Sequence, residues 1–266
     1  MPNNIPVNQT IESKIFLLRQ MVNMRLFAEF KHSFLGWAWL IIYPLFTITT
    51  WLFIKQAGVI NPGETEVPYY AYVLLGIVSW GFFFEAYKNC SNIFNNYGKI
   101  VLVNKLPLGI IVLSEFCVSF IKFLIPFSLT ILFFLISGIS IHIQILISIM
   151  PILILGLLGT CLGLLIGTLS GIAKDFSFFF DNIMRLVMLL TPIIYSPKVM
   201  NGTLAKINFY NPLNYLINSI RNLIFEGTWY EFSNTILWIS LVIILFALIL
   251  RFFIKEFPTI LERSNI

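Results

Sequence analysis

Six long apolar stretches limit what this chain can fold into more than any other feature of its sequence. They cover residues 36–54, 69–87, 110–137, 143–172, 176–195 and 231–254. A helix that crosses a bilayer needs about 20 mostly apolar residues, because its backbone hydrogen bonds must be made within the segment. The sequence therefore predicts an all-α membrane protein with six transmembrane helices.

The composition supports a membrane protein with one domain. Hydrophobic residues make up 58% of the 266 residues and charged residues 11%, whereas soluble domains have about 45–50% apolar and about 25% charged residues. The connecting segments are too short to build a core of their own. We expect a transmembrane domain at 36–255, an N-terminal interfacial helix within 1–35 and a cytoplasmic tail at 256–266.

The lysines and arginines are divided unevenly between the two sides of such a bundle. In membrane proteins the cytoplasmic loops carry the excess of these residues. One side receives Lys14, Arg19, Arg25, Lys31, Lys88, Lys99, Lys105, Lys174, Arg251, Lys255 and Arg263, and the other receives Lys55, Lys198, Lys206 and Arg221. The distribution predicts that both termini are cytoplasmic, and the net charge of +5 then reports orientation and not binding to nucleic acid.

The three cysteines do not indicate a metal site. Cys90, Cys117 and Cys161 lack CxxC spacing and have no histidine nearby, and their number is odd. A disulfide framework is equally unexpected. We expect small buried side chains here and no metal.

The N-terminal segment has the pattern of a helix that lies along the membrane surface. From residue 11 to 30 the apolar residues recur at helical spacing, with Arg19 and Asn23 elsewhere around the helix. The chain then turns at Gly36, where Trp37 and Trp39 suit the depth of the lipid headgroups.

Five quoted segments carry a resemblance to a known family. They are MRLFAEFKHSFLGWAWLIIYPL at the entry to the first stretch, YYAYVLLGIVSWGFFFEA, NYGKIVLVNKLPLGIIVLSEF, TPIIYSPKVM and INFYNPLNYLINSIRNLIF. In this order, over nearly the whole chain, they resemble the permeases of the ABC-2 type transporter family that export polysaccharides. The resemblance implies a homodimer in the bacterial inner membrane that moves an undecaprenyl-linked polysaccharide.

The energy for such transport must come from a different chain. No GxxxxGK[ST] motif is present, so this chain lacks the loop that cradles nucleotide phosphates. The resemblance implies a separate ATPase subunit that binds the ATP and docks on a coupling segment at 92–107 together with the N-terminal helix. The expected coupling residues are Arg25, Lys31, Lys99, Val101, Leu102 and Lys105.

The segment at 196–228 is too polar to span the bilayer. After Asn211 and Pro212, which suit a helix start, apolar residues occupy one face and the amides and a guanidinium the other. We expect a short amphipathic helix at the outer leaflet. The resemblance implies that re-entrant helices here gate the exit. The polar face offers hydrogen bonds to sugar hydroxyls, and its expected residues are Asn214, Asn218, Arg221 and Asn222.

Aromatic and charged residues within the stretches are candidates for the lining of a glycan channel. Flat aromatic rings pack well on sugar rings, and the expected ones are Trp39, Tyr43, Trp80 and Phe84. Asp181 and Arg185 lie four residues apart, so they either pair within one helix or line the channel. Glu115 and Lys122 also fall within a stretch, and we expect such groups to face protein or water.

The fourth stretch contains glycines at intervals of four residues. In GLLGTCLGLLIGTLSG these are Gly159, Gly163, Gly167 and Gly171, with Gly156 just before them. Small residues at this spacing let helix backbones approach closely in lipid. The pattern favours a packing face over a direct role in transport.

Three alternatives stay open at this point. O antigen is the preferred cargo, but the same family exports capsules and teichoic acids. An intramembrane glycosyl or acyl transferase acting on lipid-linked substrates would need a catalytic constellation, and no acid pair or nucleophile elbow stands out. A passive channel or drug exporter would work without an ATPase.

Overall fold

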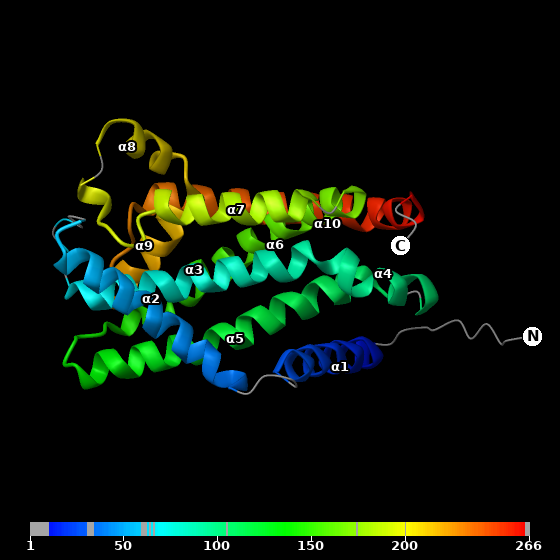
Figure 1. The fold of residues 1–266 in the computed structure, drawn as a ribbon, viewed down its shortest axis with the longest axis horizontal. Helices are drawn as coiled ribbons and strands as arrows, with labels where there is room; N and C mark the ends of the chain where they lie inside the picture. Colours follow the sequence, from blue (N-terminus) through cyan, green and yellow to red (C-terminus); the bar gives the residue numbers. More distant parts are fainter. Residues whose placement is uncertain are drawn as a thin grey trace, which may run out of the picture.

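The structure is a computed structural model that describes residues 11–30, 35–59, 63, 65, 67–104, 106–173, 175–199 and 201–263. These residues form helices and no strand (Figure 1). The α-helices are α1 (Ile11–Phe30), α2 (Trp39–Gln56), α3 (Tyr69–Ser91), α4 (Ile93–Asn104), α5 (Leu108–Ile136), α6 (Ile149–Ile172), α7 (Asp175–Leu190), α8 (Gly202–Phe209), α9 (Pro212–Phe225) and α10 (Phe232–Arg263). Short 3-10 helices cover Gly36–Ala38, Ile143–Leu146 and Pro197–Val199.

Five of the six predicted crossings are confirmed as helices long and apolar enough to span a membrane. They are Gly36–Gln56, Tyr69–Ser91, Leu108–Ile136, Ile143–Ile172 and Phe232–Glu262. The protein is therefore an all-α, multi-pass membrane protein.

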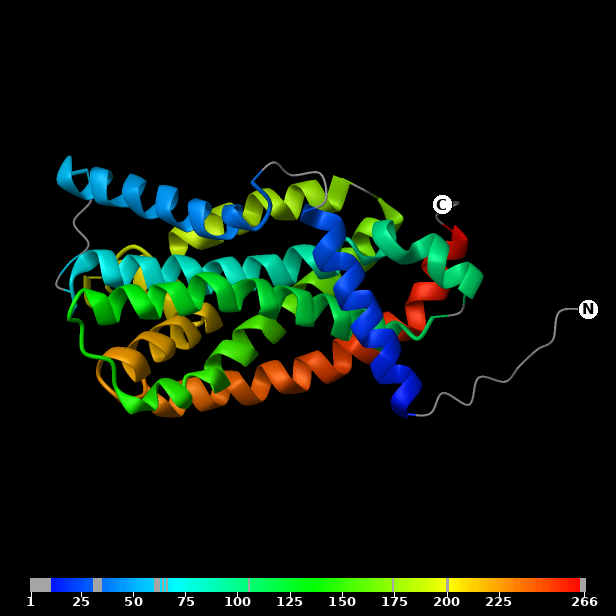
Figure 2. The same cartoon turned by 90° about the horizontal axis from the view of Figure 1, so that it is seen from below.

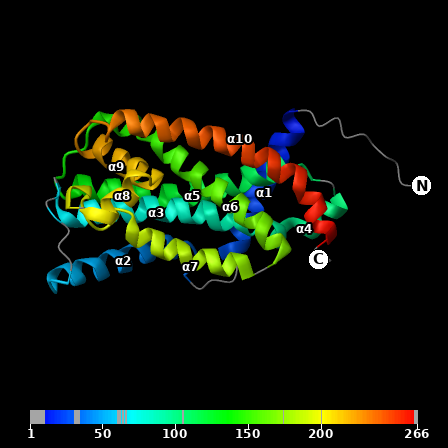
Figure 3. The same cartoon turned by 90° about the horizontal axis from the view of Figure 1, so that it is seen from above.

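The remaining predicted crossing, at 176–195, is shorter than expected. Its helix, α7, has 16 residues, which at 1.5 Å per residue is about 24 Å, less than the roughly 30 Å of a hydrocarbon core. Pro192 explains the early end, because the residue before a proline is disfavoured in the α conformation. Helices α6 and α10 run in the same direction (Figure 3). After α6 the chain must therefore return to the end where α10 begins, and α7 with the turn after it makes this return.

The bundle has two distinct ends. The helices α1 and α4 and the C-terminal part of α10 lie at one end, which we call the α1/α4 end, and α8 and α9 lie at the other, the α8/α9 end (Figure 1). Helix α1 has the predicted bounds and crosses the α1/α4 end steeply (Figure 2). Met21 and Leu26 are buried, so one face of α1 packs on protein.

Helix α3 forms the centre of the core, and α6 packs on it through its glycines. A Cβ at Gly159 would lie 2.3 Å from the carbonyl oxygen of Phe83, and one at Gly163 would lie 2.4 Å from that of Tyr87. A Cβ at Gly156 would lie 2.4 Å from the ring of Phe82. The predicted packing face is confirmed, because only glycine leaves room for the α3 backbone.

Helix α2 lies at the periphery of the bundle (Figure 2). Ile48 is its one buried residue, while Phe46 and Phe53 are well exposed. An apolar face of this kind suits lipid or a second membrane subunit.

Candidate functional site

A cavity of about 440 Å³ opens between α2, α3 and α5. It brings together all four aromatic residues expected in the channel: Trp39 and Tyr43 come from α2, and Trp80 and Phe84 come from α3. The rings of Trp80 and Phe84 are nearly parallel, at 16°, with centroids 6.4 Å apart. We call this space the aromatic cavity.

An ion pair lies in the wall of the aromatic cavity. Lys122 Nζ of α5 donates to Glu85 Oε1 of α3 over 2.6 Å, and Lys122 is buried. Asn89 donates to the same Glu85 oxygen over 3.3 Å and to Ser119 Oγ over 2.9 Å. The expectation that Lys122 faces protein or water is confirmed. Its partner Glu85 was missed, although a carboxylate within an apolar stretch is itself a reason to look for a partner.

Asp181 joins α7 to α3 and does not pair within its own helix. It forms an ion pair with Lys88 and accepts a hydrogen bond from Tyr87 Oη over 3.1 Å. Arg185 is exposed, and neither Asp181 nor Arg185 lines the aromatic cavity. Of the two alternatives left open, the pairing within α7 is not formed, because Asp181 pairs with Lys88 of α3. A place of the two residues in a glycan channel stays a prediction.

Helix α9 begins as predicted. The side chain of Asn211 accepts a hydrogen bond from the Leu213 amide over 3.0 Å, and Pro212 occupies the first turn. Both faces of this helix are buried, and its polar face points into the protein, while its place at the outer leaflet stays a prediction. Asn218 donates to Asn214 Oδ1 over 2.8 Å, and both amides are buried.

Arg221 is the best-anchored side chain at this end. Its guanidinium donates to the carbonyl oxygens of Pro192 and Ile193 over 2.7 and 2.6 Å and to Asn218 Oδ1 over 3.0 Å. It also lies 3.7 Å from the centre of the Tyr72 ring. Burial lowers the pKa of Arg221, and Tyr72 opposes this.

The position of Arg221 depends on a glycine of α3. A Cβ at Gly76 would lie 2.0 Å from Arg221 Nη2. The guanidinium therefore occupies the space that a side chain at Gly76 would fill. The helix break at Pro192 leaves carbonyl groups without helical partners, and Arg221 satisfies two of them.

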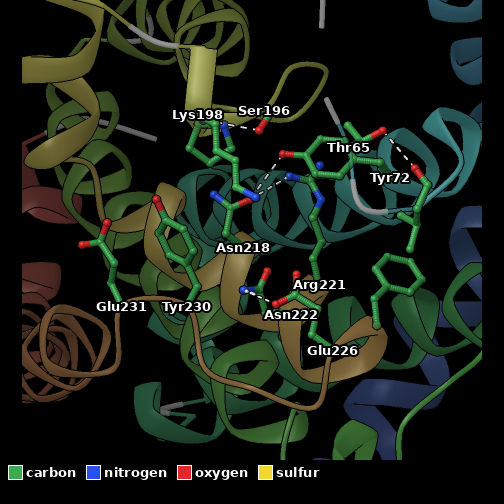
Figure 4. A pocket seen from close by; sticks show the side chains of 13 residues that line it. Thr65, Tyr72, Ser196, Lys198, Asn218, Arg221, Asn222, Glu226, Tyr230 and Glu231 are labelled. Atoms are coloured by element: carbon green, nitrogen blue, oxygen red, sulfur yellow. Dashed lines mark hydrogen bonds between the residues drawn. The ribbon is translucent and has the colours of Figure 1, made fainter. Parts of the chain in front are cut away.

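A second cavity, of about 310 Å³, lies at the α8/α9 end (Figure 4). We call it the polar pocket. Three of the four residues expected at the exit line it, namely Asn218, Arg221 and Asn222, whereas Asn214 does not. Its further charged residues are Lys198, Glu226 and Glu231. Burial, followed by the charge of Glu231, raises the pKa of Tyr230 in its wall.

At the α1/α4 end a buried carboxylate joins three helices. Glu115 of α5 accepts from Arg25 Nε of α1 over 2.9 Å and from Tyr97 Oη of α4 over 2.5 Å. Glu115 is fully buried, as expected of a carboxylate that faces protein. We call Arg25, Tyr97 and Glu115 the Glu115 cluster. Arg25, one of the six expected coupling residues, thus forms an ion pair within the protein.

The other expected coupling residues are only partly described. Val101 of α4 is partly buried against the core around Met21 and Phe94. Lys99 and Leu102 belong to α4, but their side chains lie outside the described residues, as do Lys31 and Lys105 altogether. Val101 therefore offers only part of its side chain to a docking partner, because the rest packs against the protein.

Removing the cation of the Glu115 cluster should lower the stability of the protein more than removing both of its charges. Arg25→Ala leaves the fully buried Glu115 carboxylate without its ion-pair partner, which typically costs about 3–5 kcal/mol, whereas the double variant Arg25→Ala/Glu115→Gln leaves no buried charge. We expect a lower unfolding temperature in detergent for Arg25→Ala than for the double variant. Equal unfolding temperatures would contradict a buried ion pair.

No group of three or more histidine, cysteine, aspartate or glutamate side chains is placed to hold a metal ion among the described residues. The cysteines Cys90, Cys117 and Cys161 form no disulfide.

Comparison with known proteins finds relatives of one kind. The chain is 24% identical over 231 residues to the O-antigen export system permease protein RfbA of Klebsiella pneumoniae, a match that covers 85% of this chain and 87% of that protein. A second protein of that name and organism is 27% identical over 228 residues, with 84% of this chain and 86% of the relative covered. No protein-family model matches the chain. The comparison confirms the resemblance indicated by the sequence motifs: this multi-pass chain is similar, over most of its length, to permeases of O-antigen export systems.

Proposed function

We propose that this chain is the permease subunit of an ABC transporter that exports lipid-linked polysaccharide, O antigen in the first instance, across the bacterial inner membrane. The observation that carries the proposal is the match to two O-antigen export permeases over 84–85% of the chain. The multi-pass bundle, with one cavity between α2, α3 and α5 and another at the α8/α9 end, supports it. In this proposal the chain conducts the glycan and performs no covalent step.

A separate ATPase subunit would supply the energy from the α1/α4 end. We place this end in the cytoplasm, because the sequence puts most of the lysines and arginines on its side. The Glu115 cluster links α1 and α4 to the membrane helix α5. Movement imposed on α1 or α4 would therefore reach α5 through a bonded contact. A second copy would cover the exposed face of α2, which has a single buried residue.

Cells that lack the protein provide the direct test. We expect them to accumulate undecaprenyl-linked glycan inside and to lose the surface polysaccharide, with both defects reversed by the intact gene. The chemical identity of the retained glycan would separate O antigen from capsule or teichoic acid. Normal surface polysaccharide in the deletion strain would refute the export function.

Docking of the ATPase is tested on the exposed surface of α4. Asn95 and Asn96 are exposed on this helix, so the double variant Asn95→Arg/Asn96→Arg should leave folding intact. We expect at least a tenfold loss of ATPase co-purified with the permease, because two bulky cations would enter the interface. Thr203→Arg, exposed on α8 at the other end, is the matched control. Unchanged co-purification in both variants would exclude α4 as the docking site.

A further inference from the structure

We propose that the polar pocket binds one uncharged sugar unit of the exported glycan. The proposal rests on the export function above and gives a specific site to its substrate. Three properties of the pocket carry it: its mixture of donors and acceptors, its balance of charge, and the fixed position of Arg221.

The pocket offers donors and acceptors in one small space. A sugar hydroxyl both donates and accepts, so it is satisfied best where both kinds of group converge. Lys198 and Arg221 are donors, the carboxylates of Glu226 and Glu231 are acceptors, and Asn222 provides both. The volume of about 310 Å³ is at the low end of the range for ligand pockets. This suits a single sugar unit and excludes the passage of a polymer.

The charges of the pocket balance one another. Two cationic side chains, Lys198 and Arg221, share the lining with the two carboxylates of Glu226 and Glu231. A phosphate or a uronate placed here would meet two negative groups as well as two positive ones. An uncharged unit accepts hydrogen bonds from the two cations and donates to the two carboxylates without such repulsion, and it loses less hydration energy on entry.

Arg221 is held in place before any ligand arrives. The guanidinium of Arg221 is anchored on Pro192 and Ile193, yet its buried Nε has no acceptor among the described residues. A buried donor without an acceptor indicates a missing partner. Such preorganisation lowers the entropy lost when a ligand binds.

Glu226 is held more loosely than Glu231, by neighbours that a ligand can replace. Asn222 and Thr228 donate to Glu226 Oε2 over 3.4 and 3.3 Å, and Asn234 donates to Glu231 Oε2 over 2.7 Å. The two contacts to Glu226 are long for hydrogen bonds. A sugar hydroxyl can take them over without disturbing the fold.

Binding to the purified transporter, permease together with its ATPase in lipid nanodiscs, tests the proposal. The probe is the repeat-unit oligosaccharide released by mild acid from the surface polysaccharide of the same strain, titrated by calorimetry. We expect Asn222→Ala and Glu226→Gln each to weaken binding at least tenfold. Both side chains are half-buried or exposed, so unfolding temperatures should be unchanged. Lys206→Ala, exposed on α8 and outside the pocket, should bind as the unmodified protein does.

Three results would overturn the pocket assignment. They are equal binding by the unmodified and variant proteins, tighter binding of glucuronate or inorganic phosphate than of the oligosaccharide, and no binding of the oligosaccharide at all. Export is measured separately, by surface polysaccharide in the deletion strain. No binding with normal surface polysaccharide in that strain complemented by Glu226→Gln would refute the pocket and leave the export function standing. Normal surface polysaccharide in the uncomplemented strain would refute the export function itself.

Discussion

Gly163→Leu should prevent the protein from reaching its folded state. The Cβ alone would lie 2.4 Å from the carbonyl oxygen of Tyr87 and 2.7 Å from the Cβ of Cys90, and the rest of the leucine has no space between α6 and α3. Overpacking typically costs about 1–3 kcal/mol of stability and occasionally more. Because the Tyr87 carbonyl group belongs to the backbone and cannot rotate away, we expect a cost at the high end of this range. We expect little or no monodisperse protein in fluorescence-detected size-exclusion chromatography.

A second glycine provides the control for Gly163→Leu. Gly109 is exposed near the start of α5, and a Cβ there meets nothing within 4 Å. Gly109→Leu should give a profile like that of the unmodified protein, because leucine is a better helix former than glycine. If Gly163→Leu also eluted normally, α6 and α3 would not pack through this face.

Arg221→Met should also destabilise the protein strongly. Methionine retains much of the side-chain volume but donates no hydrogen bond, so the carbonyl oxygens of Pro192 and Ile193 lose their donor. Each buried acceptor left unsatisfied costs about 1–3 kcal/mol. We expect a clear fall in the unfolding temperature measured in detergent, together with loss of export.

Gly76→Ala should reproduce this defect from the opposite side of the contact. Its Cβ would lie 2.0 Å from Arg221 Nη2, so the guanidinium must leave its carbonyl partners. Once Arg221 is methionine there is no guanidinium to displace, and only the 3.0 Å approach of the new Cβ to the Ile193 carbonyl oxygen remains. The double variant should therefore lose clearly less stability than the sum of the two single losses. Two defects that simply add would show that Gly76 and Arg221 act independently.

The parts of the fold that depend on local pattern could be predicted from the sequence. Apolar length gave five of the crossings, the four-residue spacing of Gly159 and Gly163 gave the packing face of α6, and Asn211 with Pro212 gave the start of α9. Each of these follows from a property that a segment has by itself. Trp39, Tyr43, Trp80 and Phe84 do line one cavity, and the role of that cavity as a glycan channel stays a prediction.

What could not be predicted depends on which segments meet. The polar face of α9 has the appearance of a surface, but its guanidinium is needed inside, because Pro192 leaves carbonyl groups that require a donor. Asp181 had a cation four residues away and still pairs with Lys88 of another helix. The spacing of charges along one helix carries no information about a closer partner on its neighbour.

The peripheral position of α2 has a mechanical consequence. An element with few buried contacts opens at a lower free energy than the core around it. Ile48 is the one buried residue of α2, and Trp51 and Leu52 pack against the core while only partly buried. The aromatic cavity thus has one wall, α2, that is displaced more easily than the others, which come from α3, α5 and Met188 of α7. Its width can vary with the tilt of α2 while the interlocked backbones of α3 and α6 keep their spacing.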